Sequence, residues 1–217
     1  MEIPILFEDR WLIVCVKPVG VVSEDGGMTD FLSAYLGGGR VYCVHRLDQA
    51  VGGVMVYAKD GKTAARLSEA MAARGFRKEY LAAVSGCPEP EKGEMRDLLF
   101  HDAKKNKTFV ADRKRAGVKE AALTYESLQT AEHENGRATL VRVVLETGRS
   151  HQIRAQFASR KMPLLGDGRY GSRDKSANIA LLSQRIEFLH PVTGKELRFE
   201  IPLPDAKPWN WFDRENI

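Results

Sequence analysis

The stretch VHRLDQAVGGVMVYA, residues 44–58, joins a charged segment to an apolar one. Its second half, residues 54–58, is a continuous apolar run with two β-branched residues, which predicts a buried strand. Its first half places His45, Arg46 and Asp48 shortly before a pair of glycines. Charged side chains are seldom buried unless they are paired. This stretch therefore marks both a core strand and the first candidate functional segment.

Upstream of this stretch, residues 5–22 alternate short apolar runs with turn signals, which predicts strands closed by the turn KPVG at 17–20. A short helix is predicted over residues 29–36, ended by the three glycines at 37–39. Those glycines are not a phosphate loop of the Walker A type, because no Lys-Ser or Lys-Thr pair follows them.

Downstream of this stretch, the pattern predicts two more helices and a series of strands. Asp60 is a candidate N-cap for a helix that ends at Gly75. Ser150 is a candidate N-cap for the other helix, because apolar residues at helical spacing follow it. The predicted strands cover residues 54–58, 77–84, 107–111, 121–128, 139–145, 179–182, 186–189 and 197–201.

The order of these elements favours an α+β fold with a mixed, largely antiparallel central sheet and flanking helices, because strand pairs with short turns outnumber the inserted helices. The chain has 217 residues, of which 43% are hydrophobic and 29% charged. This length suits one catalytic domain with two lobes around a cleft. We therefore expect a single domain over residues 1–217.

Cysteine, histidine and hydropathy patterns argue against several classes of protein. Cys15, Cys43 and Cys87 are widely spaced, so neither a disulfide framework nor a zinc site is expected. The five histidines show no ligand spacing, so no metal is expected. No apolar run approaches the roughly 20 residues that cross a bilayer, and the first residues do not resemble a signal peptide. We expect a cytoplasmic protein without a membrane partner.

Positive charge is concentrated in one part of the chain. The formal net charge is +4, which permits a polyanionic partner without requiring one. Residues 104–119, here called the basic segment, contain Lys104, Lys105, Lys107, Arg113, Lys114, Arg115 and Lys119. The basic segment is either a solvated hairpin or a surface that contacts phosphates.

Four stretches closely resemble, in order and spacing, the pseudouridine synthases of the RluA family: KPVG at 17–20, HRLD at 45–48, RKEY at 77–80 and TGRSHQIR at 147–154. Further matches are LLGDGRYG at 164–171 and FLHPVTGKELRFEIPLP at 188–204. The resemblance implies the pseudouridine synthase fold with a central RNA-binding cleft. It also implies an isomerase that converts uridines of ribosomal or transfer RNA to pseudouridine without a cofactor.

The resemblance assigns three catalytic residues. Asp48 matches the aspartate that either attacks C1′ of the ribose or removes a ribose proton to release the base through a glycal. A carboxylate suits this position because a glycosidic bond is broken and remade. Arg154 matches the arginine that pairs with this aspartate and keeps it ionised. Tyr80 matches the tyrosine that packs against the target uracil.

Five cationic residues are candidates for RNA contacts, since extruding a uridine leaves a gap that must be supported. Arg46 matches the family arginine beside the extruded nucleotide, and a salt bridge is the alternative for it. Arg149 lies just before the predicted Ser150 N-cap, where it could hold a phosphate at the start of that helix, and a plain surface charge is its alternative. Lys104, Lys105 and Lys107 supply the start of the basic segment.

The chain departs from the family pattern at two places. Val51-Gly52-Gly53 stands where the family has Thr-Ser-Gly, and Leu182 stands where a histidine is usual. We expect these changes to alter the surroundings of Asp48 and not the central chemistry. Many members carry a small S4-type RNA-binding domain ahead of the catalytic one, and this chain is expected to act without it.

Two other functions fit the same pattern. A non-catalytic RNA-binding or RNA-folding module could retain the fold, although the intact set of Asp48, Tyr80 and Arg154 argues against it. A hydrolase that uses Asp48 as an ordinary nucleophile would release free uracil. Nothing in the sequence demands more than a monomer.

Overall fold

The computed structural model describes residues 2–133, 136–174 and 178–217. The chain forms two compact units. Unit 1 comprises Met1–Lys78 and Leu182–Ile201, and unit 2 comprises Glu79–Leu181 and Pro202–Ile217. The chain therefore passes from one unit to the other twice before its C-terminal segment.

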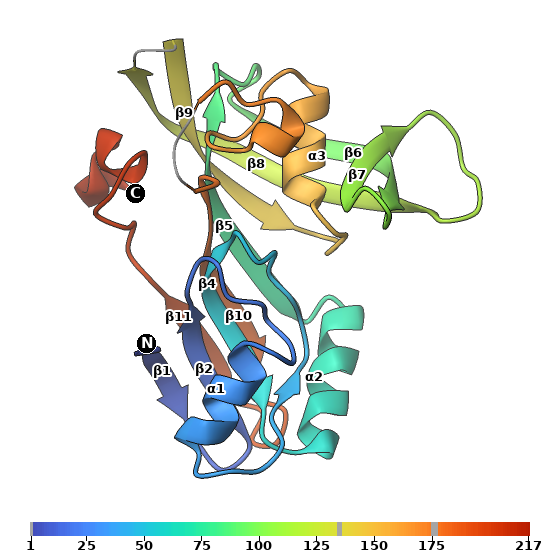
Figure 1. The fold of residues 1–217 in the computed structure, drawn as a ribbon, viewed down its shortest axis with the longest axis vertical. Helices are drawn as coiled ribbons and strands as arrows, with labels where there is room; N and C mark the ends of the chain where they lie inside the picture. The colour runs from blue at the N-terminus through green and yellow to red at the C-terminus, as the bar shows by residue number, and fades with distance from the viewer. Residues whose placement is uncertain (1, 134–135, 175–177) are drawn as a thin grey trace. The chain divides into compact units, whose positions relative to one another are not determined.

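Unit 1 is a sheet with two helices beside it (Figure 1). The strands are β1 (Ile5–Glu8), β2 (Leu12–Lys17), β3 (Tyr42–Cys43), β4 (Gly52–Ala58), β10 (Leu181–Leu189) and β11 (Glu196–Glu200). They follow the order β1-β2-β4-β10, with β3 also paired to β4 and β11 to β10. The helices are α1 (Met28–Tyr35) and α2 (Gly61–Ala72). Only the pairing of β4 with β10 is parallel within the described part of this unit.

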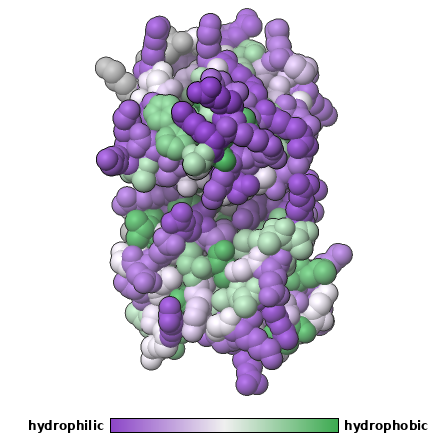
Figure 2. Space-filling view, turned by 90° about the vertical axis from the view of Figure 1, so that its right-hand side faces the viewer, coloured by the Kyte–Doolittle hydropathy of each residue, from purple (hydrophilic) through white to green (hydrophobic). Residues whose placement is uncertain are grey.

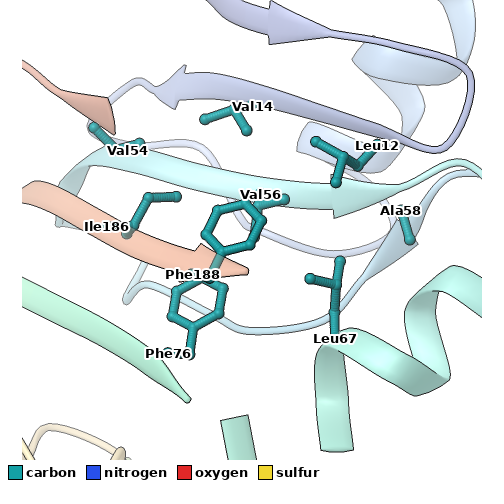
Figure 3. Close-up of a cluster of buried hydrophobic side chains, with 9 residues drawn as sticks. All are labelled: Leu12, Val14, Val54, Val56, Ala58, Leu67, Phe76, Ile186 and Phe188. Atoms are coloured by element: carbon teal, nitrogen blue, oxygen red, sulfur yellow. The ribbon is translucent and has the colours of Figure 1, made fainter. Parts of the chain in front are cut away.

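The core of unit 1 is built around the apolar run that the sequence predicts as a buried strand. All seven residues of β4 are buried. Figure 3 shows the cluster, whose members come from β2, β4, α2, β10 and the start of β5 (Phe76–Ser85): Leu12, Val14, Val54, Val56, Ala58, Leu67, Phe76, Ile186 and Phe188. The rings of Phe76 and Phe188 stack with their centroids 4.8 Å apart. Because β4 is buried on both faces, its first residues are a rigid anchor for the loop that precedes the strand.

The two helices of unit 1 confirm the sequence predictions closely. Helix α1 begins one residue before the predicted start and ends one residue before the predicted end. Asp60 caps α2, because its Oδ1 accepts a hydrogen bond from the Thr63 backbone N–H at 2.8 Å. This is the bond that a favourable N-cap residue supplies to an otherwise unpaired helix N–H.

Unit 2 is an antiparallel sheet in the order β5-β9-β8-β6-β7. The strands are β5 (Phe76–Ser85), β6 (Lys92–Asp102), β7 (Lys107–Ala111), β8 (Val118–His133) and β9 (Gly136–Leu145). Helix α3 (Gln152–Ser159) contacts β6 and β7. Three short 3-10 helices complete the unit: η1 (Gly168–Tyr170), η2 (Trp209–Trp211) and η3 (Arg214–Asn216). The predicted α+β class and largely antiparallel pairing are confirmed.

The prediction of a Ser150 N-cap is wrong. Helix α3 begins at Gln152, and His151 occupies the N-cap position with a left-handed φ of 52°. The Gln152 side chain replaces the expected cap, because its Oε1 accepts hydrogen bonds from the Arg149 N–H at 3.0 Å and from Thr147 Oγ1 at 2.8 Å. A side chain from inside the helix therefore holds the segment that precedes it.

Two strand predictions also need correction. The two strands predicted over 179–182 and 186–189 form the single strand β10, because the intervening Ser183 and Gln184 are buried with polar partners. Ser183 Oγ donates to the Val54 carbonyl at 3.0 Å, and Gln184 Nε2 donates to Glu200 at 3.2 Å. Strand β6 was not predicted, since exposed polar residues interrupt its apolar pattern.

No described helix is long and apolar enough to cross a membrane.

Candidate functional site

Asp48 lies in the loop that leads into β4. Its carbonyl accepts a hydrogen bond from the Val51 N–H at 2.9 Å. The preceding Leu47 is only 7% exposed, and its N–H and carbonyl both bond to the buried Ser23 hydroxyl at 3.0 Å. Leu47 thus belongs to the core and anchors the backbone directly before the carboxylate. Arg46 on its other side is exposed.

The KPVG turn contributes a buried lysine to the same loop. Lys17 is 1% exposed, and its Nζ donates to the carbonyls of Pro18 at 2.9 Å, Val21 at 2.6 Å and Gln49 at 3.4 Å. Burial lowers the pKa of Lys17 to about 8, and the negative charge of Asp48 opposes that fall. The residue directly after Asp48 is therefore held in place by the Lys17 ammonium group.

Lys17 lies in the KPVG motif, but nothing in the sequence indicates a role for it. A lysine that ends an apolar strand and precedes proline is usually a solvated surface residue. Only the fold reveals that its side chain turns inward to three carbonyls. Its burial makes it a structural member of the Asp48 loop.

The glycine pair that follows the loop is required by close backbone contacts. Gly53 has a φ of +127°, and a Cβ built on it would lie 2.2 Å from the Ser183 carbonyl oxygen. A Cβ on Gly52 would lie 3.1 Å from the Lys17 carbonyl oxygen, which is tighter than ordinary contact. Gly52 is also the parallel partner of Leu182. The two places where the chain departs from the family pattern are therefore neighbours in one sheet.

Arg46 and His45 have separate environments. Arg46 Nη1 forms an ion pair with Glu24 at 3.2 Å, and both side chains are more than half exposed. His45 is buried, and its Nε2 accepts a hydrogen bond from the Val56 N–H at 3.2 Å. Burial, aided by the charge of Lys78, lowers the pKa of His45 well below its ordinary value. A neutral His45 therefore fixes the loop to β4 and is not a proton donor at neutral pH.

In unit 2, Arg154 lies on α3 and is 4% exposed. Its Nε and Nη2 donate to the two carboxylate oxygens of Asp167, at 2.7 and 2.9 Å. The Tyr170 ring centroid lies 5.0 Å from the guanidinium carbon. A bidentate pair and an aromatic ring together fix the plane of the guanidinium group.

Asp167 and Tyr170 were missed as site residues. Both belong to the LLGDGRYG motif, which the sequence marked as similar to the family without assigning it a role. The predicted partner of Arg154 was Asp48, which belongs to unit 1, and that pairing stays a prediction. The structure shows that the carboxylate of Asp167, which lies in the same unit, holds Arg154.

Tyr170 also joins three elements of unit 2. Its hydroxyl accepts a hydrogen bond from the Thr108 N–H at 2.8 Å and bonds to His151 Nδ1 at 3.0 Å. Thr108 Oγ1 in turn donates to the Ser150 carbonyl at 2.7 Å. Burial raises the pKa of Tyr170. The neutral phenol therefore connects β7, the start of α3 and η1 around the arginine.

Tyr80 is 5% exposed and lies in β5, where it is paired with Val143 of β9. Its neighbour Glu79 is also buried and forms an ion pair with Arg142 at 3.0 Å. The tyrosine is thus part of a well-ordered strand.

The predicted RNA-contacting residues of unit 2 are divided between two places. Lys104 and Lys105 are exposed in the turn between β6 and β7, and Lys107 begins β7 with its Nζ on the Arg169 carbonyl at 2.6 Å. Arg149 is exposed, and its Nε donates to the Glu120 carbonyl at 2.9 Å. No group of metal-binding side chains occurs among the residues that the structure describes.

Comparisons with known proteins agree on one family. The model of the RNA pseudouridylate synthase family matches residues 11–159. The chain is 33% identical to the RNA pseudouridine synthase YhcT of Bacillus subtilis, covering 94% of this chain and 69% of that protein. It is 34% identical to the ribosomal large subunit pseudouridine synthase D of Vibrio cholerae, covering 94% of this chain and 68% of that protein.

Solved structures show the same fold. Human RNA pseudouridylate synthase domain containing 4 superposes with a TM-score of 0.76 at 22% identity, covering 93% of this chain and 89% of that one. Human RNA pseudouridylate synthase domain containing 1 gives a TM-score of 0.81 at 18% identity, covering 94% and 85%. The family model and the curated relatives show that the chain belongs to the RNA pseudouridine synthases of the RluA family.

Proposed function

We propose that this protein converts specific uridines of ribosomal or transfer RNA to pseudouridine, with Asp48 as the catalytic carboxylate. The observation that carries the proposal is the Asp48 loop. Leu47 anchors it to Ser23 on one side, and Lys17 holds the Gln49 carbonyl on the other. A reacting group needs this kind of support, because small displacements of a catalytic group lower the rate strongly.

The reaction explains why a carboxylate is needed there. The bond from C1′ of the ribose to N1 of uracil breaks, and a bond from C1′ to C5 forms. Asp48 either attacks C1′ and is displaced when C5 bonds, or removes a ribose proton and returns it when the base rejoins. In both routes the proton on C5 is lost and N1 gains one. The isomerisation is redox-neutral, so it calls for no redox cofactor.

Arg154 is proposed to pair with Asp48 during the reaction. Asp167 and the Tyr170 ring support this role, because they hold the guanidinium group in one plane. A cation beside Asp48 keeps the carboxylate ionised in a site that excludes water. Tyr80 is proposed to pack against the target uracil.

Five cations are proposed to bind the RNA. Arg46 is suited to the gap left by the extruded uridine, because its ion pair with Glu24 is exposed and such pairs contribute little stability. Arg149 and the three lysines Lys104, Lys105 and Lys107 would contact phosphates. The relatives named for the ribosomal large subunit favour ribosomal RNA as the first substrate to test.

The test is a comparison of pseudouridine maps of cellular RNA with the wild-type protein, with Asp48→Asn and with the protein absent. We expect Asp48→Asn to lose the same positions as the deletion, whereas Asp30→Asn, at an exposed aspartate of α1, retains them. Retention of every position by Asp48→Asn would contradict the catalytic role. Bound RNA with no modified position at all would favour the non-catalytic module, and release of free uracil would favour hydrolysis.

A further inference from the structure

The hairpin of β6 and β7 carries two aromatic residues on one face. Phe100 and Phe109 are direct cross-strand partners, so their side chains lie on the same side of the hairpin. Phe109 is 39% exposed although it lies within a strand. We call this side, with the cations described below, the Phe109 face. Large apolar side chains left exposed beside charged groups often mark a binding surface.

The opposite side of the hairpin is occupied by the protein itself. Leu99 and Thr108 are 3% and 2% exposed. Leu99 belongs to a small core with Ala155 of α3, and Thr108 bonds to the Ser150 carbonyl. Because side chains alternate along a strand, packing this side against α3 directs Phe100 and Phe109 away from it. The Phe109 face is therefore not needed for the core of unit 2.

Three cations of the basic segment surround these rings. Lys105 Nζ lies 5.9 Å and Lys107 Nζ 5.6 Å from the Phe109 ring centroid. The Arg115 guanidinium carbon lies 5.4 Å from the Phe100 ring centroid. Figure 2 shows the molecule from the right-hand side of Figure 1, and hydrophilic side chains dominate the upper part of that surface, with a small hydrophobic area among them.

An exposed ring among cations has the chemistry of a nucleic-acid surface. Base stacking on aromatic side chains and contacts from nearby cations to phosphates are the two features of single-strand binding sites. An apolar protein partner would have to bury these charges, which is costly unless they are paired. The positive charge of the basic segment therefore favours a polyanion, and the exposed ring favours a base that is not already stacked in a duplex.

We propose that the Phe109 face binds an unpaired nucleotide of the RNA, with its base stacked on Phe109 and its phosphates near Lys105 and Arg115. This inference rests on the proposed function only in taking RNA as the substrate. Lys107 is anchored to the Arg169 carbonyl, whereas Lys105 is an exposed side chain that can turn from the ring to a phosphate. The face would add a contact outside the Asp48 loop and so help to choose the target.

The test uses Phe109→Leu, which keeps an apolar side chain against Phe100 and removes the aromatic ring. The probes are a stem-loop RNA with an unpaired loop and the matched fully paired duplex, and binding is followed by fluorescence anisotropy. We expect Phe109→Leu to weaken stem-loop binding about fivefold or more and to leave duplex binding unchanged. Phe109→Trp should restore the affinity.

Val110→Ala is the matched control. Val110 follows Phe109 in β7, is 40% exposed and points to the other side of the hairpin. It should bind both RNAs like the wild type. Because no charge is lost, Phe109→Leu should also leave the salt dependence of binding unchanged, whereas loss of a phosphate contact would reduce it.

Two outcomes would overturn the inference: equal binding of the stem-loop by wild type and Phe109→Leu, or equal weakening for stem-loop and duplex. Neither outcome bears on the pseudouridine map, which tests Asp48. Conversely, the wild type could modify no RNA while Phe109→Leu still binds the stem-loop more weakly than the wild type does. This result would overturn the proposed function and support the Phe109 face. The two failures are therefore distinguishable.

Discussion

At the scale of single residues, the buried pair of Arg154 and Asp167 gives the sharpest consequence. Both side chains are at most 5% exposed, so each charge depends on the other. Removing one partner of a buried ion pair typically costs several kcal/mol, because the remaining charge stays out of water. Asp167 is therefore expected to matter for folding and, through Arg154, for the reaction.

We predict that Asp167→Asn lowers the free energy of unfolding by about 3 kcal/mol, as measured by urea denaturation. It should also lower the single-turnover rate on bound RNA, because Arg154 loses the bidentate contact that orients it. Asp167→Glu, which keeps the charge, should recover more of the rate than Asp167→Asn. An unchanged rate in a folded Asp167→Asn protein would mean that the orientation of Arg154 does not depend on this carboxylate.

The control for this prediction is Glu132→Gln. Glu132 forms an ion pair with Arg137 at 2.8 Å, and both side chains are largely exposed. Exposed pairs contribute at most about 1 kcal/mol, so this variant should unfold almost like the wild type. A large loss of stability in the control would show that charge removal alone, and not burial, explains the effect at Asp167.

The residues that sequence reasoning found and missed differ in one respect. Asp48, Tyr80 and Arg154 stand out because they lie in motifs whose chemistry the resemblance supplies. Lys17 and Asp167 lie in motifs of the same kind, but their roles depend on which atoms they meet in the fold. Side-chain partners that are distant in sequence cannot be obtained from spacing alone, and both residues are buried charges that base rates place on the surface.

At the scale of elements, the pairing of β4 with β10 connects the two departures from the family pattern. Gly52 and Leu182 are parallel partners, and Leu182 is 6% exposed. The family pattern has a polar pair, serine and histidine, at these two positions, whereas this chain has glycine and leucine. The two changes are therefore expected to be coupled energetically.

We predict that Leu182→His alone destabilises the protein by about 1 to 3 kcal/mol, because no hydrogen bond compensates the cost of removing the imidazole from water. Gly52→Ser alone should also destabilise it, since its Cβ meets the Lys17 carbonyl at 3.1 Å. The double variant should lose less stability than the sum, because hydroxyl and imidazole can bond to each other. A double-mutant cycle in urea measures this coupling, and strict additivity would contradict it.

The elements that the sequence predicted well are those with one dominant signal. The apolar run of β4 and the Asp60 cap of α2 are local features, and both are confirmed. Strand β10 was split in two because Ser183 and Gln184 are polar but buried, and their partners lie in β4 and β11. The start of α3 was misplaced because Gln152 supplies the contacts expected of Ser150. In β10, partners distant in sequence override local propensity, whereas at α3 a side chain within five residues takes the place of the expected cap.

At the scale of the whole molecule, the motifs are shared between the two units. Unit 1 holds the Asp48 loop and the buried Lys17, and unit 2 holds Tyr80, Arg154 and the carboxylate of Asp167. Each unit therefore holds some of the residues to which the proposed chemistry is assigned. The cations proposed to contact RNA are likewise divided, with Arg46 in unit 1 and Arg149 and the three lysines of the basic segment in unit 2.

The small net charge of +4 makes the position of cations more important than their number. We predict that replacing Lys104, Lys105 and Lys107 by Gln flattens the dependence of RNA affinity on salt concentration. The slope of log affinity against log salt should fall by about 0.7 to 0.9 for each phosphate contact that is lost. Binding measured by anisotropy over a series of salt concentrations gives this slope directly.

A charge-matched control separates local contacts from the general field of the protein. Replacing Lys62, Arg66 and Lys195 by Gln removes the same three charges from exposed positions of unit 1 that are not proposed to meet RNA. If the basic segment contacts phosphates, only the first triple variant lowers the slope, because counterions are released where phosphates are neutralised. Equal slopes in the two triple variants would assign the basic segment to a solvated hairpin, and RNA binding would then depend on cations elsewhere in the molecule.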